Sequence, residues 1–214
     1  MNVPSLILCF LASYLLGSIP WGYLLVRWFK GIDIRRQGSG NIGFTNVLRT
    51  AGRPLGVLTL ALDAGKGYAA VALLAPHLAG TGSGADVFAI AAFVGAVLGH
   101  VFTPFLRFRG GKGIAVGAGA LLALSPAAFA VCLGLWLAVV AGTRYVSLAS
   151  VVAAAALPAA VYYFERATKL SIFAVLVAAL VIFRHAGNIR RLLEGKERRI
   201  GEKVGGGTEP PQGL

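Results

Sequence analysis

Long stretches without a charged side chain dominate this sequence. They cover residues 1–26, 67–85, 87–106, 113–143, 145–164 and 170–183. A helix needs roughly 20 apolar residues to cross the hydrocarbon core of a bilayer. Only 13% of the residues are charged and 57% are hydrophobic, whereas soluble domains carry about 25% charged residues. The sequence therefore predicts an all-α, polytopic integral membrane protein and excludes a soluble one.

The number of spans depends on two stretches. Residues 1–26 lack a basic start and are followed by Arg27 and Lys30, so they predict a membrane helix rather than a signal peptide. A second span is expected over residues 54–78. Residues 113–143 fit one long helix or two helices broken at Ser125 and Pro126, because proline disfavours helix in the residue before it.

The distribution of cations favours two helices in that stretch. With seven spans and the N-terminus outside, only Arg166 and Lys169 of the 20 Lys and Arg residues lie outside the cell. Six spans would export Arg144 and the basic C-terminal segment, against the rule that cations stay on the cytoplasmic side. We therefore expect seven membrane helices, an external N-terminus and a cytoplasmic C-terminus.

No soluble domain and no internal repeat is visible. Residues 1–200 are expected to form a single transmembrane domain, and residues 201–214, rich in Gly and Pro, a flexible cytoplasmic tail. Cys9 and Cys132 lie far apart in apolar stretches, which is typical of packing residues. The net charge of +12 follows from membrane topology, so no nucleic acid partner is expected.

The first polar segment, residues 35–49, carries Gly38, Gly40 and Gly43 among cations, amides and hydroxyls. Glycines let backbone N–H groups converge on an anion, and hydroxyl and amide side chains add donors. This pattern favours a phosphate site. A basic loop that only fixes topology is the alternative, but topology requires the charges alone.

The second polar segment, residues 107–113, places three cations and three glycines before a predicted helix. The N-terminus of a helix favours bound anions, so a phosphate site is expected here as well, with a plain basic turn as the alternative. The segment is no nucleotide-binding P-loop, because Leu106 and Gly113 stand where that motif needs Gly and Ser or Thr.

Three further groups stand out. Asp63 and Lys66 are spaced for an ion pair inside a span, which is a functional candidate by default, although structural pairing is equally open. His185 and Asn188 share a face if the last helix continues, and histidine suits proton transfer near neutral pH; a lone interfacial histidine is the alternative. His100 is expected to face the cytoplasm. No cluster has metal-ligand spacing.

Taken together, these segments resemble the acyl-phosphate-dependent glycerol-3-phosphate acyltransferases of bacteria (PlsY). The matching motifs, in chain order, are Gly17-Ser18-Ile19-Pro20, Gly38-Ser39-Gly40-Asn41 with Gly43, Thr45, Asn46 and Arg49, Asp63 with Lys66-Gly67, Gly99-His100, Gly110-Gly111-Lys112-Gly113, Arg144 with Ser147, and His185 with Asn188-Ile189, Arg191-Leu192, Gly195 and Glu197.

The resemblance implies transfer of a fatty acyl group from acyl phosphate to the 1-hydroxyl of glycerol 3-phosphate, giving lysophosphatidic acid and phosphate, the first step of phospholipid synthesis. It implies catalytic roles for His185, Asn188, Ser147, Ser39 and Arg49. It implies substrate binding by Gly40, Asn41, Thr45, Asn46, Lys66, Gly110, Gly111, Lys112, Gly113 and Arg144. Either His185 or the departing phosphate then serves as the general base.

The resemblance implies no cofactor, no metal ion and no obligate protein partner. The partners are acyl phosphate, glycerol 3-phosphate and membrane lipid, and the active site lies on the cytoplasmic face of the bacterial inner membrane. A transporter of a phosphorylated metabolite is the competing function. It predicts polar residues through the midplane and often inverted repeats, whereas here the polar groups gather at one predicted face.

Overall fold

The computed structural model describes residues 2–80 and 84–202, and the secondary structure in these ranges is helical throughout. The first half contains α1 (Val3–Ser18), α2 (Trp21–Lys30), η1 (Ile34–Arg36), α3 (Phe44–Ala51), α4 (Arg53–Ala69), η2 (Ala70–Leu74), α5 (Ala75–Ala79) and α6 (Ala85–Val101). The second half contains η3 (Pro104–Leu106), α7 (Ile114–Leu124), α8 (Pro126–Thr143), α9 (Val146–Glu165), α10 (Thr168–Arg184) and α11 (Ala186–Leu193).

Within the described residues, five helical segments are long and apolar enough to cross a membrane, and six if the bent pair α10–α11 is one span. The five are Val3–Lys30, Arg53–Ala79, Ala85–Leu106, Pro126–Thr143 and Val146–Glu165. The short apolar helix α7 is separate from them. These findings confirm an all-helical membrane protein, whereas the count of seven and the orientation stay predictions.

Proline sets two of the breaks. The predicted break at Ser125 and Pro126 is confirmed, since α7 ends at Leu124 and α8 begins at Pro126. The first apolar stretch is also divided, because Pro20 has no N–H to donate and separates α1 from α2. The π-helical turn η2 joins α4 to α5 within the second span.

Glycine allows two helix pairs to pack with their backbones almost in contact. A Cβ at Gly99 of α6 would lie 2.1 Å from the carbonyl oxygen of Tyr14 in α1, and one at Gly119 of α7 would lie 1.9 Å from that of Ala64 in α4. Small residues favour such close approach between membrane helices. Gly95 of α6 allows the same close approach, since a Cβ there would lie 2.5 Å from the carbonyl oxygen of Phe10 in α1.

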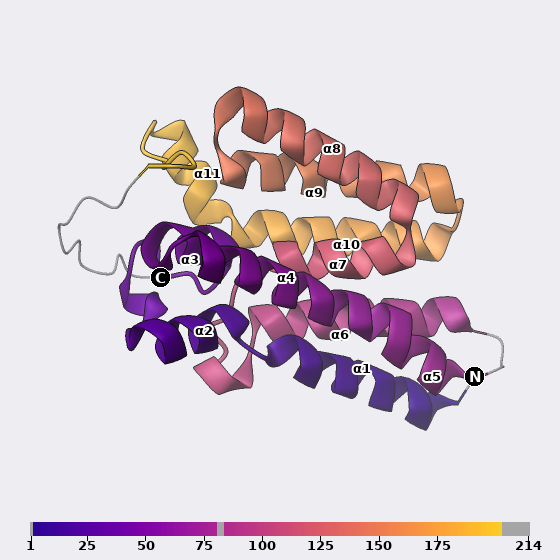
Figure 1. Cartoon of the computed structure of the whole chain (residues 1–214). Coiled ribbons are helices and arrows are strands. Elements are labelled where there is room, and N and C mark those ends of the chain that lie inside the picture. Colours follow the sequence, from indigo (N-terminus) through magenta and orange to yellow (C-terminus); the bar gives the residue numbers. More distant parts are fainter. Residues whose placement is uncertain (1, 81–83, 203–214) are drawn as a thin grey trace.

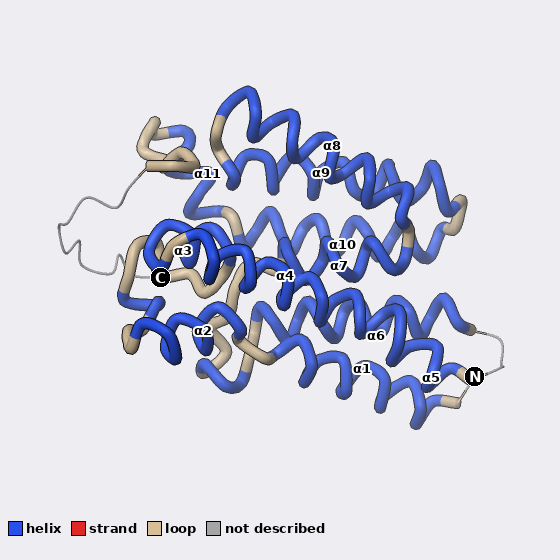
Figure 2. The backbone as a smooth tube through the Cα atoms, viewed as in Figure 1, coloured by secondary structure: helices blue, strands red, loops and turns tan. Residues whose placement is uncertain are grey.

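Figure 1 shows the consequence for the whole bundle: α1, α4 and α6 form one side, α8 and α9 the other, and α7 and α10 lie between them. Figure 2 shows that the short helices α2, α3 and α11 and most of the longer connections gather at the same end of the bundle. The polar motifs lie in these segments. The predicted tail begins at residue 201, and its residues 203–214 lie outside the described residues, so its flexibility stays a prediction.

Candidate active site

The centre of the polar end is Glu197, which follows α11. Its Oε1 accepts hydrogen bonds from Ser147 Oγ at 2.7 Å and from Asn188 Nδ2 at 2.6 Å, and its Oε2 accepts one from Arg191 Nε at 2.8 Å. Burial raises the pKa of this carboxyl, but the bonds from Asn188, Ser147 and Arg191 outweigh burial and the pKa is lowered. A carboxylate therefore orients three side chains from α9 and α11.

Lys112 reaches the same group from the loop before α7. Its Nζ donates to Asn188 Oδ1, so one amide lies between the ammonium and the Glu197 carboxylate. Burial lowers the pKa of Lys112 to about 8, with Glu197 acting against that shift. Gly113, at φ +85°, caps α7 directly after Lys112, a backbone conformation that favours glycine. The loop thus brings a partly buried cation to a helix N-terminus.

The two glycines before Lys112 have a different role from the predicted one. Their N–H groups already donate to backbone carbonyls, Gly110 to Val101 and Gly111 to His100, each at 3.0 Å. A Cβ at Gly111 would lie 2.1 Å from His100 Nε2. The N–H groups of Gly110 and Gly111 are therefore unavailable for a phosphate in this geometry, and both glycines serve close packing against α6.

His185 marks the bend between α10 and α11. The shared face of His185 and Asn188 was expected only if the last helix continues, and that condition is not met as a straight helix, because α10 and α11 are bent by 57° at this residue. The ring is buried, and Nδ1 lies 2.8 Å from the carbonyl oxygen of Val181. Since a carbonyl only accepts, Nδ1 carries the proton and Nε2 of the neutral ring carries the lone pair.

The polar loop of residues 37–46 is organised by Asn46, which is 2% exposed. Its Oδ1 accepts from the N–H of Ser39 at 3.0 Å, and its Nδ2 donates to the carbonyl oxygens of Gln37 and Asn41. Asn41 Oδ1 accepts from the N–H of Gly43 at 2.8 Å. Both amides thus build the loop, which leaves the half-buried Thr45 and the exposed Ser39 as its hydroxyl donors.

Two arginines that the sequence predicts as site residues, Arg49 and Arg144, lie at the edge of the group around Glu197. Arg49, in α3, is half-buried, and burial and then the nearby Arg198 lower its pKa, while Glu197 opposes this. Arg49 is therefore within electrostatic reach of the Glu197 group. Arg144, in the connection between α8 and α9, is exposed, and its Nη2 donates to the carbonyl oxygen of Ile200 at 3.0 Å. Arg144 thereby fastens the segment that carries Glu197.

Lys66 lies outside the group around Glu197, with its side chain buried on α4. Its Nζ lies 2.8 Å from Asp63 Oδ1, donates to the carbonyl oxygen of Ile19 at 2.7 Å and lies 3.1 Å from His100 Nδ1. The side chains of Lys66, Asp63 and His100 are at most 4% exposed. Both side chains are buried here, so substrate binding by Lys66 and the cytoplasmic position of His100 stay predictions. The ion pair, left open between function and structure, links α4 to His100 of α6 and to Ile19 in the connection between α1 and α2.

The structure thus brings together Lys112, Ser147, Asn188 and Glu197, with Arg49 and Arg191 beside them. Sequence reasoning assigned no role to Glu197 or Arg191, although both belong to the final motif. The signal that was available is their place in that motif, Arg191-Leu192 with Gly195 and Glu197. Among the described residues, no three His, Cys, Asp or Glu side chains are arranged to hold a metal ion.

Comparison with known proteins connects this geometry to a family. The family model for glycerol-3-phosphate acyltransferases matches residues 7–195. The chain belongs to the glycerol-3-phosphate acyltransferase family. It is an acyltransferase of the membrane, and the transporter alternative is set aside.

Individual relatives agree along nearly the whole chain. The glycerol-3-phosphate acyltransferase of Desulforamulus reducens is 45% identical over 92% of this chain and 96% of its own length. Glycerol-3-phosphate acyltransferase 2 of Moorella thermoacetica is 47% identical over 92% of this chain and 98% of its own length. The crystal structure of PlsY, an integral membrane glycerol 3-phosphate acyltransferase, in its glycerol 3-phosphate form is similar at a TM-score of 0.85 and 36% identity, covering 92% and 96% of the two chains.

Proposed function

We propose that this protein transfers a fatty acyl group from acyl phosphate to the 1-hydroxyl of glycerol 3-phosphate, giving lysophosphatidic acid and inorganic phosphate. The observation that carries the proposal is the partly buried Lys112 held against Asn188 and the Glu197 network, in a chain whose relatives are named for glycerol 3-phosphate. A partly buried cation beside a helix N-terminus attracts a phosphate, and long apolar helices suit an acyl chain.

The reaction requires no nucleotide, because acyl phosphate is already an activated acyl donor. The oxygen at C1 of glycerol 3-phosphate attacks the acyl carbonyl carbon, and the bond from that carbon to the phosphate oxygen breaks. Phosphate leaves with the bonding electron pair, and the hydroxyl proton passes to a base. Lys112 and Arg49 would stabilise the negative charge that develops on the carbonyl and phosphate oxygens.

His185 is one candidate for that base. Its Nδ1–H is committed to Val181, so the free lone pair of Nε2 is available for the proton, which is the tautomer that base catalysis requires. The departing phosphate is the other acceptor. Ser147 and Asn188, both bound to Glu197, would orient glycerol 3-phosphate, and Ser39 and Thr45 would donate to a phosphate from the α3 side.

The proposed topology has seven spans, with α7 as the short one, an external N-terminus and the active site facing the cytoplasm of the bacterial inner membrane. Support comes from the positive charges that gather at the end with α2, α3 and α11. The test is cysteine labelling in cells: Asn2→Cys should react with an impermeant reagent, and Lys196→Cys should not. Cys9 and Cys132 are buried, so background labelling is small. External labelling of position 196 would reject the orientation.

The function is tested with the purified protein, acyl phosphate and radiolabelled glycerol 3-phosphate. Labelled lysophosphatidic acid is expected with the wild type and not with Lys112→Gln, which removes the charge and keeps most of the side-chain volume. A well-folded wild type that forms no labelled lipid would reject the proposal.

A further inference from the structure

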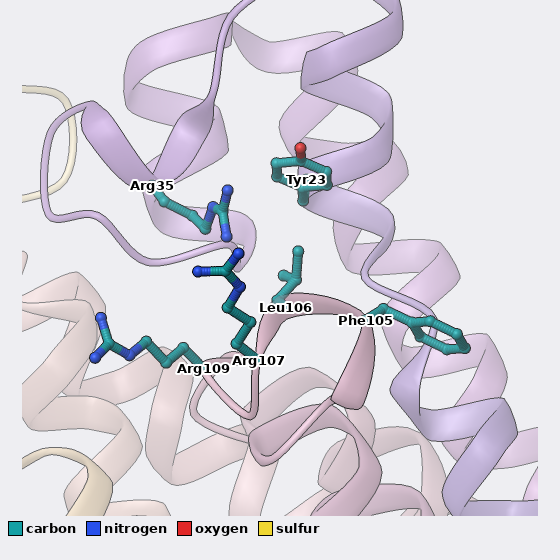
Figure 3. A pocket seen from close by; sticks show the side chains of 6 residues that line it. All are labelled: Tyr23, Arg35, Phe105, Leu106, Arg107 and Arg109. Atoms are coloured by element: carbon teal, nitrogen blue, oxygen red, sulfur yellow. The ribbon is translucent and has the colours of Figure 1, made fainter.

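A cavity of about 530 Å³ beside α2 and η3 suggests a second anion-binding site. It is lined by Tyr23, Arg35, Phe105, Leu106, Arg107 and Arg109 (Figure 3). None of these residues belongs to the Lys112, Ser147, Asn188 and Glu197 group. The cavity therefore lies outside the proposed active site.

The charges in this cavity are poorly compensated. Arg35 is held by Asp33, with 2.7 Å between Nη2 and Oδ2, and its guanidinium lies 4.9 Å from the centre of the Tyr23 ring. Among the described residues, no acidic side chain pairs with Arg107 or Arg109. Figure 3 shows the guanidinium groups of Arg35 and Arg107 directed toward one another. An anion between them would relieve this repulsion.

An apolar groove adjoins the charged cavity. It has a volume of about 300 Å³ and is lined by Ile19, Pro20, Tyr23, Leu24, Phe105 and Leu106. Three of these residues, Tyr23, Phe105 and Leu106, also line the charged cavity. The two spaces are thus adjacent, one cationic and one apolar, which is the complement of an anionic amphiphile.

The surroundings indicate the depth of this site in the membrane. Trp28 and Phe29 of α2 are 64% and 67% exposed, next to Arg27 and Lys30, and Phe105 and Phe108 are 62% and 61% exposed. Exposed aromatic and basic residues in such combination are typical of the membrane–water interface. The cationic cavity therefore lies at the level of the lipid head groups, where a membrane phospholipid is the abundant anionic amphiphile.

We propose that this cavity and groove bind one anionic phospholipid of the surrounding membrane, its phosphate between Arg35 and Arg107, with Arg109 as a further cation of the cavity lining, and an acyl chain along Leu24 and Phe105. The inference requires only that the protein spans the membrane and does not depend on the reaction proposed above. Its readout is binding, so it can fail while the acyltransferase assay succeeds, and the reverse.

The test is a titration of the full-length protein in a neutral detergent, followed by native mass spectrometry. The probes are phosphatidylglycerol, phosphatidylcholine with the same chains, and inorganic phosphate. One phosphatidylglycerol should bind saturably and more tightly than phosphatidylcholine. The double variant Arg107→Gln/Arg109→Gln should weaken its binding about 10- to 30-fold, as expected for losing two cations near a head group.

Two controls separate this site from general charge and from misfolding. Arg166→Gln/Lys169→Gln removes the same charge between α9 and α10 and should leave the affinity unchanged. Phe105→Gln alters an exposed wall of the groove without touching a cation, and should also weaken phosphatidylglycerol binding while the unfolding temperature stays that of the wild type.

Four outcomes would overturn the proposal. The first is equal binding of phosphatidylglycerol and phosphatidylcholine. The second is the same loss of affinity in the double variant and in the Arg166→Gln/Lys169→Gln control, or no loss in either. The third is displacement of the lipid by inorganic phosphate at equal concentration, which would make this a free-anion site. The fourth is displacement by a hydrolysis-resistant acyl phosphonate at concentrations that inhibit turnover, which would make it a donor site.

Discussion

Ser147, in the first turn of α9, donates a hydrogen bond of 2.7 Å to Oε1 of Glu197, which lies beyond α11. The same oxygen accepts from Asn188 at 2.6 Å. One carboxylate therefore fixes the orientation of two side chains with proposed roles in binding glycerol 3-phosphate. The consequence is that Glu197 acts as a positioning residue.

Replacement of Glu197 by Gln removes the charge and turns one acceptor oxygen into a donor. It should lower the free energy of unfolding by about 1–3 kcal/mol, because hydrogen bonds to charged groups contribute about that much. It should also raise KM for glycerol 3-phosphate more than it lowers kcat. Thermal unfolding and steady-state kinetics measure both effects; the matched exposed change Glu194→Gln should alter neither.

The stability effect of Glu197 depends on pH in a defined direction. Its pKa is lowered in the folded protein, since the hydrogen bonds outweigh burial. The contribution to stability is therefore fully present above the ordinary Glu value of about 4.3 and is lost as pH falls through the lower folded value. The difference in unfolding temperature between wild type and Glu197→Gln should shrink as pH falls below about 4.

The lowered pKa of Lys112 sets the expected alkaline limit of activity. Burial lowers its pKa to about 8, so the ammonium is charged below that pH and loses its proton above it. The second pKa of a phosphate monoester is about 6, which keeps the substrate charge constant in this range. KM for a phosphate substrate should rise as pH increases from 7.5 to 9, and the Lys112→Arg variant should show no such rise.

An unchanged KM across that range in the wild type would show that Lys112 does not bind the substrate phosphate as a cation. A rise of the same size in Lys112→Arg would assign the titration to another group.

His185→Ala should lower kcat by about 10²–10⁴-fold with little change in KM, because a positioned base contributes that much to a proton transfer. His77→Ala, at the opposite end of the bundle in α5, is the control for loss of an imidazole. If His185→Ala folds normally and keeps kcat within a few-fold of the wild type, the departing phosphate is the base and His185 only packs at the α10–α11 bend.

Lys66→Met should destabilise the protein by about 3–5 kcal/mol, because it leaves Asp63 buried without its cation. The double variant Asp63→Leu/Lys66→Met should recover part of this loss. Arg190→Met breaks an exposed pair with Glu194 at 2.9 Å and should cost less than 1 kcal/mol. Equal unfolding temperatures for Lys66→Met and Arg190→Met would show that the buried pair has no structural role.

The sequence was sufficient for the helical class and for the break at Ser125 and Pro126, because uncharged stretches and proline act locally. The bend at His185 could not be predicted in the same way. No proline or helix-ending pattern precedes His185. The bend accompanies the long-range contacts that place Asn188 against Lys112 and Glu197.

The motifs indicated which segments carry the site but not what each side chain does. Asn46 and Asn41 suit a phosphate by residue type, yet they hydrogen-bond to their own loop. Gly111 suits a phosphate cradle, yet it packs on His100. Such roles depend on which backbone groups the fold brings near, and residue spacing along the chain does not contain that information.

The acyl donor defines the proposed reaction, and its identity is tested most directly by the stoichiometry of its cleavage. Purified wild-type protein, without added metal, is incubated with labelled glycerol 3-phosphate and either acyl phosphate or acyl-CoA. One inorganic phosphate should be released for each lysophosphatidic acid formed from acyl phosphate, and little product should form from acyl-CoA. Equal turnover with acyl-CoA, or product formation without matching phosphate release, would contradict it.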